Sequence, residues 1–397
     1  MYEVKFELIK YVLMKIESRI IEILLVLFVL LSCSTENKNK EFETINFTRE
    51  KSLFKHDLVI KYINLMTNKD CIIGQIASIQ LVGNRLFIED KYYSNSLFVF
   101  DLKGRFITKI GEHGAGPNQY SRIFDFDIDT KGRKIAISDR DAGRILFYDL
   151  NDYHFLYAKK TSFSYQSFLF SNDGKIYFFS NSGFKKRYKS KNSYYVMRTD
   201  SLSLKSEKEF YKAGFISNFS EGISGKSGLY RCNQTIFIYH QLFPYVYRIE
   251  NNELKQTYKI NIASFKFPTV EYLQHVAGNN QDYTNSLHNS EYITCYSIKE
   301  TKELLVLSLN KNNQPYIAFY NKLLKTGYIY SIADYFKLLN LGAYIVPIGA
   351  NDEYIIGEVQ LDEHSIKYIS KDNPLYDIAK KRSEDENPVI CLIKLKR

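Results

Sequence analysis

The chain has 397 residues, with 54 Lys and Arg against 44 Asp and Glu, which gives a formal net charge of +10. A basic balance can indicate nucleic-acid binding, but the export signal described next argues against that class of partner. The lysines are scattered, so they indicate a solvated surface with only a non-specific attraction to acidic glycans or an anionic envelope. Tyr and Phe are frequent and Trp is absent, a bias that suits the faces of β-sheets.

The N-terminal segment 1–33 is typical of an export signal. Its apolar run, Ile20–Leu31, follows basic residues and is shorter than the about 20 apolar residues that span a membrane. The run ends in Leu-Leu-Ser-Cys33 and is similar to the lipobox of bacterial lipoproteins, in which the Cys becomes the lipidated N-terminus. We therefore expect Cys33 to carry the lipid that anchors the protein in the outer membrane, facing the periplasm or the cell exterior. An uncleaved N-terminal anchor is the alternative.

Residues 34–52 are polar and charged and predict a flexible tether, which leaves 53–397 for the fold. The roughly 360 residues that follow the signal exceed a typical single domain, but repeat architectures are not bound by this limit because each unit buries its faces against its neighbours. None of the four later cysteines forms the CxxC pair that a zinc site would need, and two lie within apolar runs. Buried free thiols are therefore favoured over disulfides for Cys71, Cys232, Cys295 and Cys391.

The stretch Ser96–Asp139 predicts two β-hairpins joined by a Gly-rich loop. In the first hairpin the turn is Asp101–Gly104, where Gly104 is free to adopt a positive φ. After the loop Gly111–Tyr120, apolar and acidic residues alternate with the period of two that is typical of a strand. The apolar residues are Phe124, Phe126 and Ile128, and the acidic residues are Asp125, Asp127 and Asp129.

This pattern repeats along the chain. Arg85–Asp90, Lys134–Asp139 and Lys175–Ser180 align, and Asp90 and Asp139 are 49 residues apart. Later copies, interpreted as the outer strand pairs of their units, are Thr235–Tyr239 with Tyr245–Ile249, Leu304–Ser308 with Pro315–Tyr320, and Glu353–Gly357 with Val389–Lys394. Six starts, near residues 85, 134, 175, 235, 303 and 353, predict an all-β, six-bladed β-propeller with mostly four-stranded antiparallel blades.

Both ends of the repeat array are strand-like. Leu58–Ile63 and Val389–Lys396 are expected to share one blade, because a ring of blades must hide its open edges. Three insertions with helical character are expected as loops that decorate one rim, where loops usually carry function. They are Phe267–Ser290, Ser331–Leu341 and Asn373–Glu386.

The run Phe100–Asp129 resembles the six-bladed β-propeller lipoproteins of Gram-negative bacteria, which are relatives of NHL-repeat propellers. Gly114, Gly116, Pro117 and Tyr120 match the Gly-x-Gly-Pro-x-x-Tyr loop of these proteins, and the run Glu384–Val389 matches their C-terminal region. The resemblance implies the fold and a location in the cell envelope. It supplies no catalytic residues, because the family as a class has no settled activity.

Few residues in this chain point to chemistry. Asp125, Asp127 and Asp129 share one strand face, with neighbours about 7 Å apart, and need either solvent or a cation. An acidic strand end facing solvent is the favoured interpretation, and a Ca²⁺ ion, the one cofactor considered, would need six to eight oxygens. In the Gly-rich loop, His113 is the best-placed histidine for a ligand or base. The loop glycines, Gly111 included, favour a tight crossing between blades over an anion cradle.

A non-enzymatic binding module for a protein, peptide or glycan is the leading functional hypothesis, and a monomer is expected. The alternative is an NHL-like lyase or lactonase with an axial divalent metal; its candidate ligands are His240, His275, His288 and His364, which lie in four units. No HxH, HExxH, GxSxG or P-loop spacing supports an enzyme. Aromatic loops could stack on ligands, although core packing is expected for most of them: Tyr92-Tyr93, Phe184–Tyr188 and Phe243–Tyr247.

Overall fold

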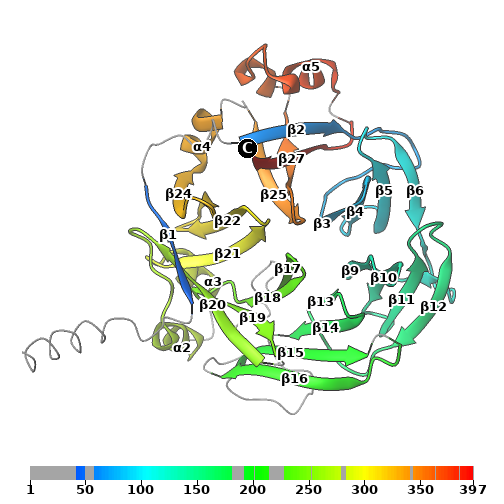
Figure 1. Ribbon diagram of the computed structural model, residues 1–397. Coiled ribbons are helices and arrows are strands. Elements are labelled where there is room, and N and C mark those ends of the chain that lie inside the picture. The colour runs from blue at the N-terminus through cyan, green and yellow to red at the C-terminus, as the bar shows by residue number, and fades with distance from the viewer. Residues whose placement is uncertain are drawn as a thin grey trace, which may run out of the picture. The chain divides into compact units, whose positions relative to one another are not determined.

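Six sheets of four or five strands stand around a central axis in the computed structural model of the protein (Figure 1). The structure describes residues 42–49, 58–180, 192–200, 202–213, 228–251, 253–278, 283–339, 343–362, 364–383 and 385–396. Within these ranges, no helix is long and apolar enough to cross a membrane. Cys33 and the export signal lie outside the described residues, as does the aromatic loop Phe184–Tyr188.

The first three blades are antiparallel sheets that run outward from the axis in chain order. Blade 1 contains β3 (Ser78–Val82), β4 (Arg85–Asp90), β5 (Ser96–Asp101) and β6 (Phe106–Ile110). Blade 2 contains β9 (Asp125–Asp129), β10 (Lys134–Asp139), β11 (Arg144–Asp149) and β12 (Phe155–Lys160). Blade 3 contains β13 (Ser167–Phe170), β14 (Lys175–Ser180), β15 (Asn192–Asp200) and β16 (Ser206–Ala213). A short parallel pair, β7 (Glu112–His113) and β8 (Gln119–Tyr120), lies in the connection between blades 1 and 2.

The other three blades continue the ring, and two of them recruit a strand from the N-terminal part of the chain. Blade 4 contains β17 (Gly228–Cys232), β18 (Thr235–Tyr239), β19 (Tyr245–Glu250), β20 (Glu253–Ile262) and β1 (Glu43–Phe47). Blade 5 contains β21 (Ile293–Glu300), β22 (Leu304–Lys311), β23 (Gln314–Asn321) and β24 (Thr326–Ser331). Blade 6 contains β25 (Tyr344–Ala350), β26 (Ile355–Gln360), β27 (Val389–Leu395) and β2 (Leu58–Asn64). The six-bladed propeller predicted from the repeat is confirmed, but the late repeats are the second and third strands of their blades, counted from the axis, and not the outer pair.

The ring closes in blade 6, as the two strand-like ends predicted. All seven residues of β2 pair antiparallel with β27, from Leu58 opposite Leu395 to Asn64 opposite Val389. Just before β27, the Asn387 side chain is buried and fixes the chain that leaves β2: its Oδ1 accepts from Ile73 N at 2.7 Å. Its Nδ2 donates to the carbonyls of Met66 at 2.7 Å and Cys71 at 2.5 Å. Asn387 therefore connects the start of β27 in blade 6 to the segment that leads from β2 into blade 1.

The expected tether over 34–52 is wrong in its second half, because Glu43–Phe47 forms β1. Ile45 and Phe47 alternate with polar residues and are buried, a pattern too short to stand out in the sequence. Beyond β1, Thr48 exchanges backbone hydrogen bonds with Gly327 and Ile329 in the outermost part of blade 5. The compact unit of the fold accordingly begins at Thr44.

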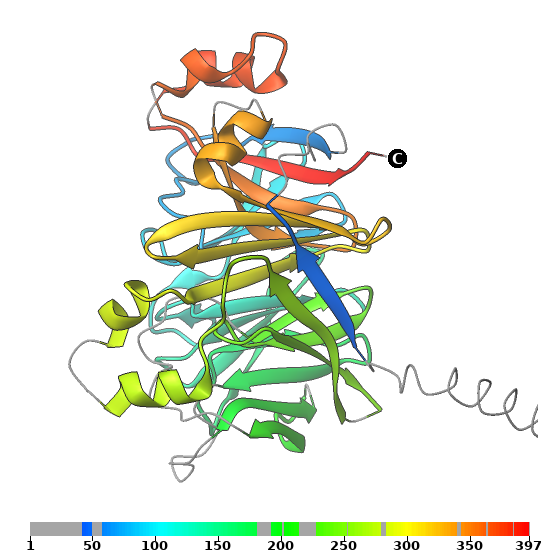
Figure 2. The ribbon, with the colours of Figure 1, turned by 90° about the vertical axis from the view of Figure 1, so that its left-hand side faces the viewer.

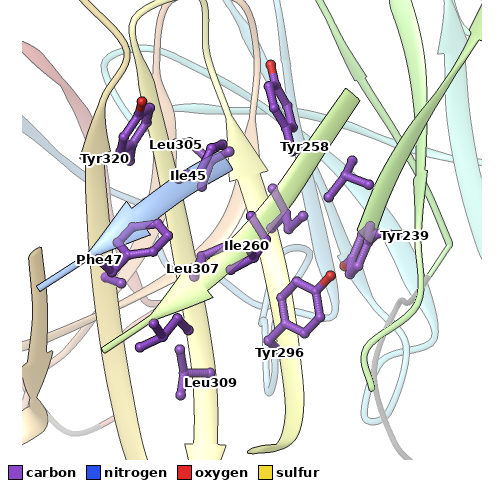
Figure 3. Packing of buried hydrophobic residues seen from close by; sticks show 14 of the residues in the cluster. Ile45, Phe47, Tyr239, Tyr258, Ile260, Tyr296, Leu305, Leu307, Leu309 and Tyr320 are labelled. Atoms are coloured by element: carbon purple, nitrogen blue, oxygen red, sulfur yellow. The ribbon is translucent and has the colours of Figure 1, made fainter. Parts of the chain in front are cut away.

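In the described part of the chain, six apolar clusters are each wedged between two neighbouring blades. A smaller seventh cluster joins Leu242 to Leu273 of α2 (Val270–Gly278) and Leu287 of α3 (Tyr283–His288). Alternate residues of the second strand in each blade point to opposite clusters, so this strand reads as continuously apolar. In β4, for example, Leu86 and Ile88 pack toward blade 6 and Phe87 toward blade 2. Figure 3 shows the cluster between blades 4 and 5, where Ile45 and Phe47 of β1 contact the same group as Tyr296 and Leu307.

Of the three predicted insertions, one carries two helices, α2 and α3, that project from one face of the ring, whereas α4 (Ile332–Leu339) and α5 (Pro374–Lys381) lie along its outer edge, on the outer strands of blades 5 and 6 (Figure 2). The 3₁₀ helix η3 (Ser365–Tyr368) precedes α5. At the start of α5, Asn373 accepts a hydrogen bond from Leu375 N, and Pro374 occupies the first turn, where its missing N–H costs nothing. We call the face of the ring that carries α2 and α3, together with the turns after β4 and β10, the helix face.

Candidate functional site in the central channel

The innermost strands of all six blades line a cavity of about 540 Å³ on the ring axis, here called the channel cavity. This volume lies within the range of about 300–1,000 Å³ that is typical of small-molecule sites. Apolar residues of β3, β9, β13, β17, β21 and β25 form much of its wall, and charged residues are interspersed among them. The charged residues are Asp125, Asp127, Arg231, Lys299, Glu300, Asp352 and Glu353.

Two of the predicted aspartates hold the inner edge of the next blade. An innermost strand exposes N–H groups that no neighbouring strand can pair. Asp125 Oδ2 accepts from Phe168 N at 3.1 Å, and Asp127 Oδ2 accepts from Phe170 N at 2.6 Å. Because residues two apart on β9 point the same way, the two carboxylates match alternate N–H groups of β13.

All three acidic side chains of β9 are buried, with 3%, 5% and 6% of Asp125, Asp127 and Asp129 exposed. The interpretation of an acidic strand end facing solvent is therefore wrong. Asp129 Oδ1 accepts from Gly132 N at 2.7 Å and fixes the β9–β10 turn. Each carboxylate thus has its own backbone partner.

Asp127 also joins four blades. Its Oδ1 accepts from Gln80 Nε2 of blade 1 at 3.0 Å and lies 3.6 Å from Arg231 Nη2 of blade 4. Arg231 in turn donates to the carbonyl of Phe170 in blade 3. Burial raises the pKa of Asp127, and the charge of Arg231 together with these hydrogen bonds opposes that rise. This arrangement holds the acidic and basic groups of the cavity in fixed positions.

A second buried network lies between blades 4 and 5. Glu300 accepts hydrogen bonds from Tyr230 Oη at 2.6 Å, Tyr258 Oη at 2.9 Å and Lys322 Nζ at 2.6 Å. Burial and the charge of Glu300 raise the pKa of Tyr230 well above its usual value, so this phenol remains a donor. At the cavity mouth, Asp352 of blade 6 accepts from Asn233 N of blade 4 at 2.7 Å.

The Gly-rich loop is fixed to blade 2 and does not line the cavity. Arg144 Nη2 donates to Gln119 O at 2.6 Å, and Tyr148 Oη donates to Asn118 O at 3.0 Å. Gly111 has φ +65°, and a Cβ there would lie 2.5 Å from Tyr148 Oη. His113 is exposed in β7, so the structure does not bring it together with the aspartates.

The other sequence candidates are also dispersed. His240 is buried at the end of β18, and neither it nor His275, His288 or His364 lines the cavity. Among the described residues, ligand-type side chains converge at Asp149, Asp152 and His154, whose ligand atoms lie within 4.8 Å of one another. This exposed turn after β11 lies outside the cavity, and its acidic groups accept hydrogen bonds from the turn itself.

Sequence reasoning missed Gln80, Arg231 and Glu300. Each occupies an innermost strand and contacts a partner in another blade, more than 40 residues away in the chain. The sequence offers one signal for such residues, a polar side chain within a short apolar strand. This signal identifies a channel residue only when the strand is known to lie next to the ring axis.

Comparison with known proteins agrees with this architecture. The model of a family described as 6-bladed beta-propeller (DUF5128) matches residues 33–358. A solved structure of a Bacteroides fragilis protein inferred to be exported is similar at 25% identity and TM-score 0.77, covering 89% of this chain and 100% of that one. A Bacteroides vulgatus member of the DUF4221 family shares the fold at 11% identity and TM-score 0.53, covering 86% of this chain and 99% of that one.

No curated protein matches the sequence. The family match spans far more than half of the chain and includes the first five blades. The protein is therefore a member of the DUF5128 family of six-bladed β-propellers.

Proposed function

We propose that the protein is an exported, lipid-anchored β-propeller that binds a protein, peptide or glycan ligand in the cell envelope without transforming it. The channel cavity carries this proposal, because all six blades line it and its polar groups are already oriented. A preorganised site loses little conformational freedom when a ligand binds. Its mixed charge suits a ligand segment with both donors and acceptors.

The anchor rests on the lipobox-like run that ends at Cys33 and on the similarity to a neighbour inferred to be exported. Lipidation at Cys33 would place the propeller at the outer membrane, on the periplasmic or the outer side. Incorporation of labelled palmitate into the full chain tests this part. We expect incorporation in the native protein and none in the Cys33→Ser variant, and an unlabelled native protein would refute the anchor.

Binding at the cavity is tested with peptide and glycan arrays and a variant that narrows its mouth. Asn172 is exposed, lies in the β13–β14 turn and lines the cavity. Asn172→Trp should weaken an array ligand at least tenfold. Asn289→Trp, at an equally exposed turn after α3 on the helix face, should leave the affinity unchanged.

The alternative, a lyase or lactonase with an axial divalent metal, makes a different prediction for the same purified protein. Metal analysis should then find one equivalent of ion, and the ligand should be consumed over time. A ligand recovered intact from a metal-free protein supports the binding module. If Asn172→Trp leaves the affinity for an array ligand unchanged, the channel cavity is not the binding site of that ligand.

A further inference from the structure

Three loops lie together on the helix face at the junction of blades 1 and 2. They are 91–95 after β4, 121–124 before β9 and 140–143 after β10. Asn95 Nδ2 donates to Ser121 O at 3.2 Å, and Lys91 Nζ donates to Phe124 O at 3.1 Å. Phe124 N donates to Ser138 O at 2.8 Å, which ties the second loop to the end of β10.

These loops bring cations and aromatic rings into contact. Lys91 Nζ lies 4.2 Å from the centroid of the Phe124 ring and 6.0 Å from that of Tyr92. The guanidinium carbon of Arg140 lies 3.5 Å from the Phe124 centroid. We call the group the cation–aromatic patch; it comprises Lys91, Tyr92, Tyr93, Arg122, Phe124 and Arg140.

Two tyrosines of the patch are unusually open to solvent. Tyr92 is 64% exposed and Tyr93 is 74% exposed. Tyr93 is nevertheless fixed, because its ring packs on Gly74, where a Cβ would lie 2.4 Å from Tyr93 Cγ. Its backbone N–H also donates to the buried Asp90 at 3.1 Å. A rigid aromatic ring held at the surface is typical of a recognition surface, since little entropy is lost when a ligand covers it.

The patch carries an excess of positive charge. At its surface, Lys91, Arg122 and Arg140 are accompanied by the acidic residue Asp141. Asp90 and Asp139 are buried beneath the loops, where Asp90 accepts from Tyr93 N and Asp139 pairs with Arg144 and accepts from Ser121 N. Asp141 pairs with Arg122 at 3.0 Å. Burial lowers the pKa of Arg140, and Arg122 adds to this lowering while Asp141 opposes it. An anion placed over Arg140 and Lys91 would therefore meet two cations.

We propose that the cation–aromatic patch binds an acidic polysaccharide, one whose sugars carry carboxylate or sulfate groups. The flat C–H face of a sugar ring can stack on the negative face of an aromatic ring, while the guanidinium and ammonium groups pair with its anions. An acidic peptide would satisfy the charges but offers no such flat face to Tyr92 and Tyr93. This inference names a ligand class for the binding role proposed above and rests on that role, but it uses the helix face and not the channel cavity.

The experiment measures binding of the purified full-length protein in detergent to oligogalacturonate, with neutral dextran and poly-glutamate as comparison probes. We expect oligogalacturonate to bind, with an affinity that falls as salt rises, and dextran not to bind. Arg140→Gln and Tyr92→Ala should each weaken binding about tenfold. Lys371→Gln and Tyr368→Ala, which change an exposed basic residue and an exposed tyrosine outside the patch, should change the affinity less than twofold. Thermal unfolding of each variant checks that the fold is retained.

Three results would overturn the inference. Poly-glutamate that binds as tightly as oligogalacturonate, without loss in Tyr92→Ala, would make the patch an acidic-peptide surface. Equal weakening by Arg140→Gln and Lys371→Gln would reduce the binding to diffuse charge. Failure of oligogalacturonate to bind would refute the patch as a glycan site. An array ligand sensitive to Asn172→Trp would still support the proposed function in each case, whereas absence of any ligand would refute both.

Discussion

Asn387 holds the closure of the ring, so Asn387→Ala should destabilise the protein far more than a surface substitution. The change removes the partner of Ile73 N and the donors to the carbonyls of Cys71 and Met66. A buried polar group left without a partner costs about 1–3 kcal/mol. Ile73 and Cys71 are buried, whereas Met66 is 42% exposed and its carbonyl can be reached by water more easily. The expected loss in free energy of unfolding is therefore about 3–4 kcal/mol.

Urea unfolding of the chain from Ser34 onward measures this loss. Asn118→Ala is a matched control, because Asn118 is exposed and surface substitutions of this kind usually change stability by less than about 0.5 kcal/mol. Hydrogen exchange should show the loosening first in β2 and in the segment 65–73, where the lost partners lie. Equal midpoints for the two variants, or faster exchange spread evenly over all blades, would refute the reasoning.

Three further predictions follow from the described contacts. Burial lowers the pKa of His240 from 6.5 to about 3, so the unfolded chain takes up the proton first: stability is full above about pH 6.5 and is lost as pH falls toward 3. Between pH 7 and pH 5 the protonation of His240 in the unfolded chain lowers the free energy of unfolding by about 2 kcal/mol. His240→Gln should therefore flatten that part of the stability–pH curve, and an unchanged slope would mean that other groups cause the loss. Burial raises the pKa of the Cys232 thiol to about 12 and also raises the pKa of Cys391. A thiol reagent should therefore label both cysteines only after denaturation, and fast labelling of the native protein would contradict their burial. Gly104→Ala should lower the free energy of unfolding by about 3 kcal/mol, because φ is +79° and a Cβ would lie 1.9 Å from Asn64 O. Gly83→Ala, at φ +56° with open space around it, should lower it by only about 1 kcal/mol. Thermal unfolding measures both, and similar losses would mean that the close approach to Asn64 is unimportant.

The blades could be predicted from the sequence because each of their middle strands can be recognised from its own residues and the turns beside it. Arg85–Asp90 and Lys134–Asp139 combine continuous apolar character with nearby turn residues, and both lie where a strand must be buried on two faces. The Gly104 turn adopts the predicted positive φ. The four later cysteines are free thiols, as favoured from their apolar surroundings. These features depend on neighbours within a few residues.

The channel could not be predicted in the same way. The role of Asp127 depends on Phe170, 43 residues later, and on Arg231 from a third blade. Only ring closure brings them together, and the sequence alone showed three like charges on one strand. β17, which carries Arg231, has only five residues. Similarly, β1 is a strand because blade 4 offers it an edge, not because its own residues demand it.

The pairing of β2 with β27 also sets a schedule for biogenesis. Tyr62 and its partner Cys391 are 329 residues apart, so at about 5–20 residues per second the earlier strand waits about 15–65 s for the later one to be synthesised. Until then β2 and the outer edge of β26 are both unpaired, and either could pair with the wrong chain. A molecule without β27 would keep both edges unpaired, so the ring cannot close before this strand is in place.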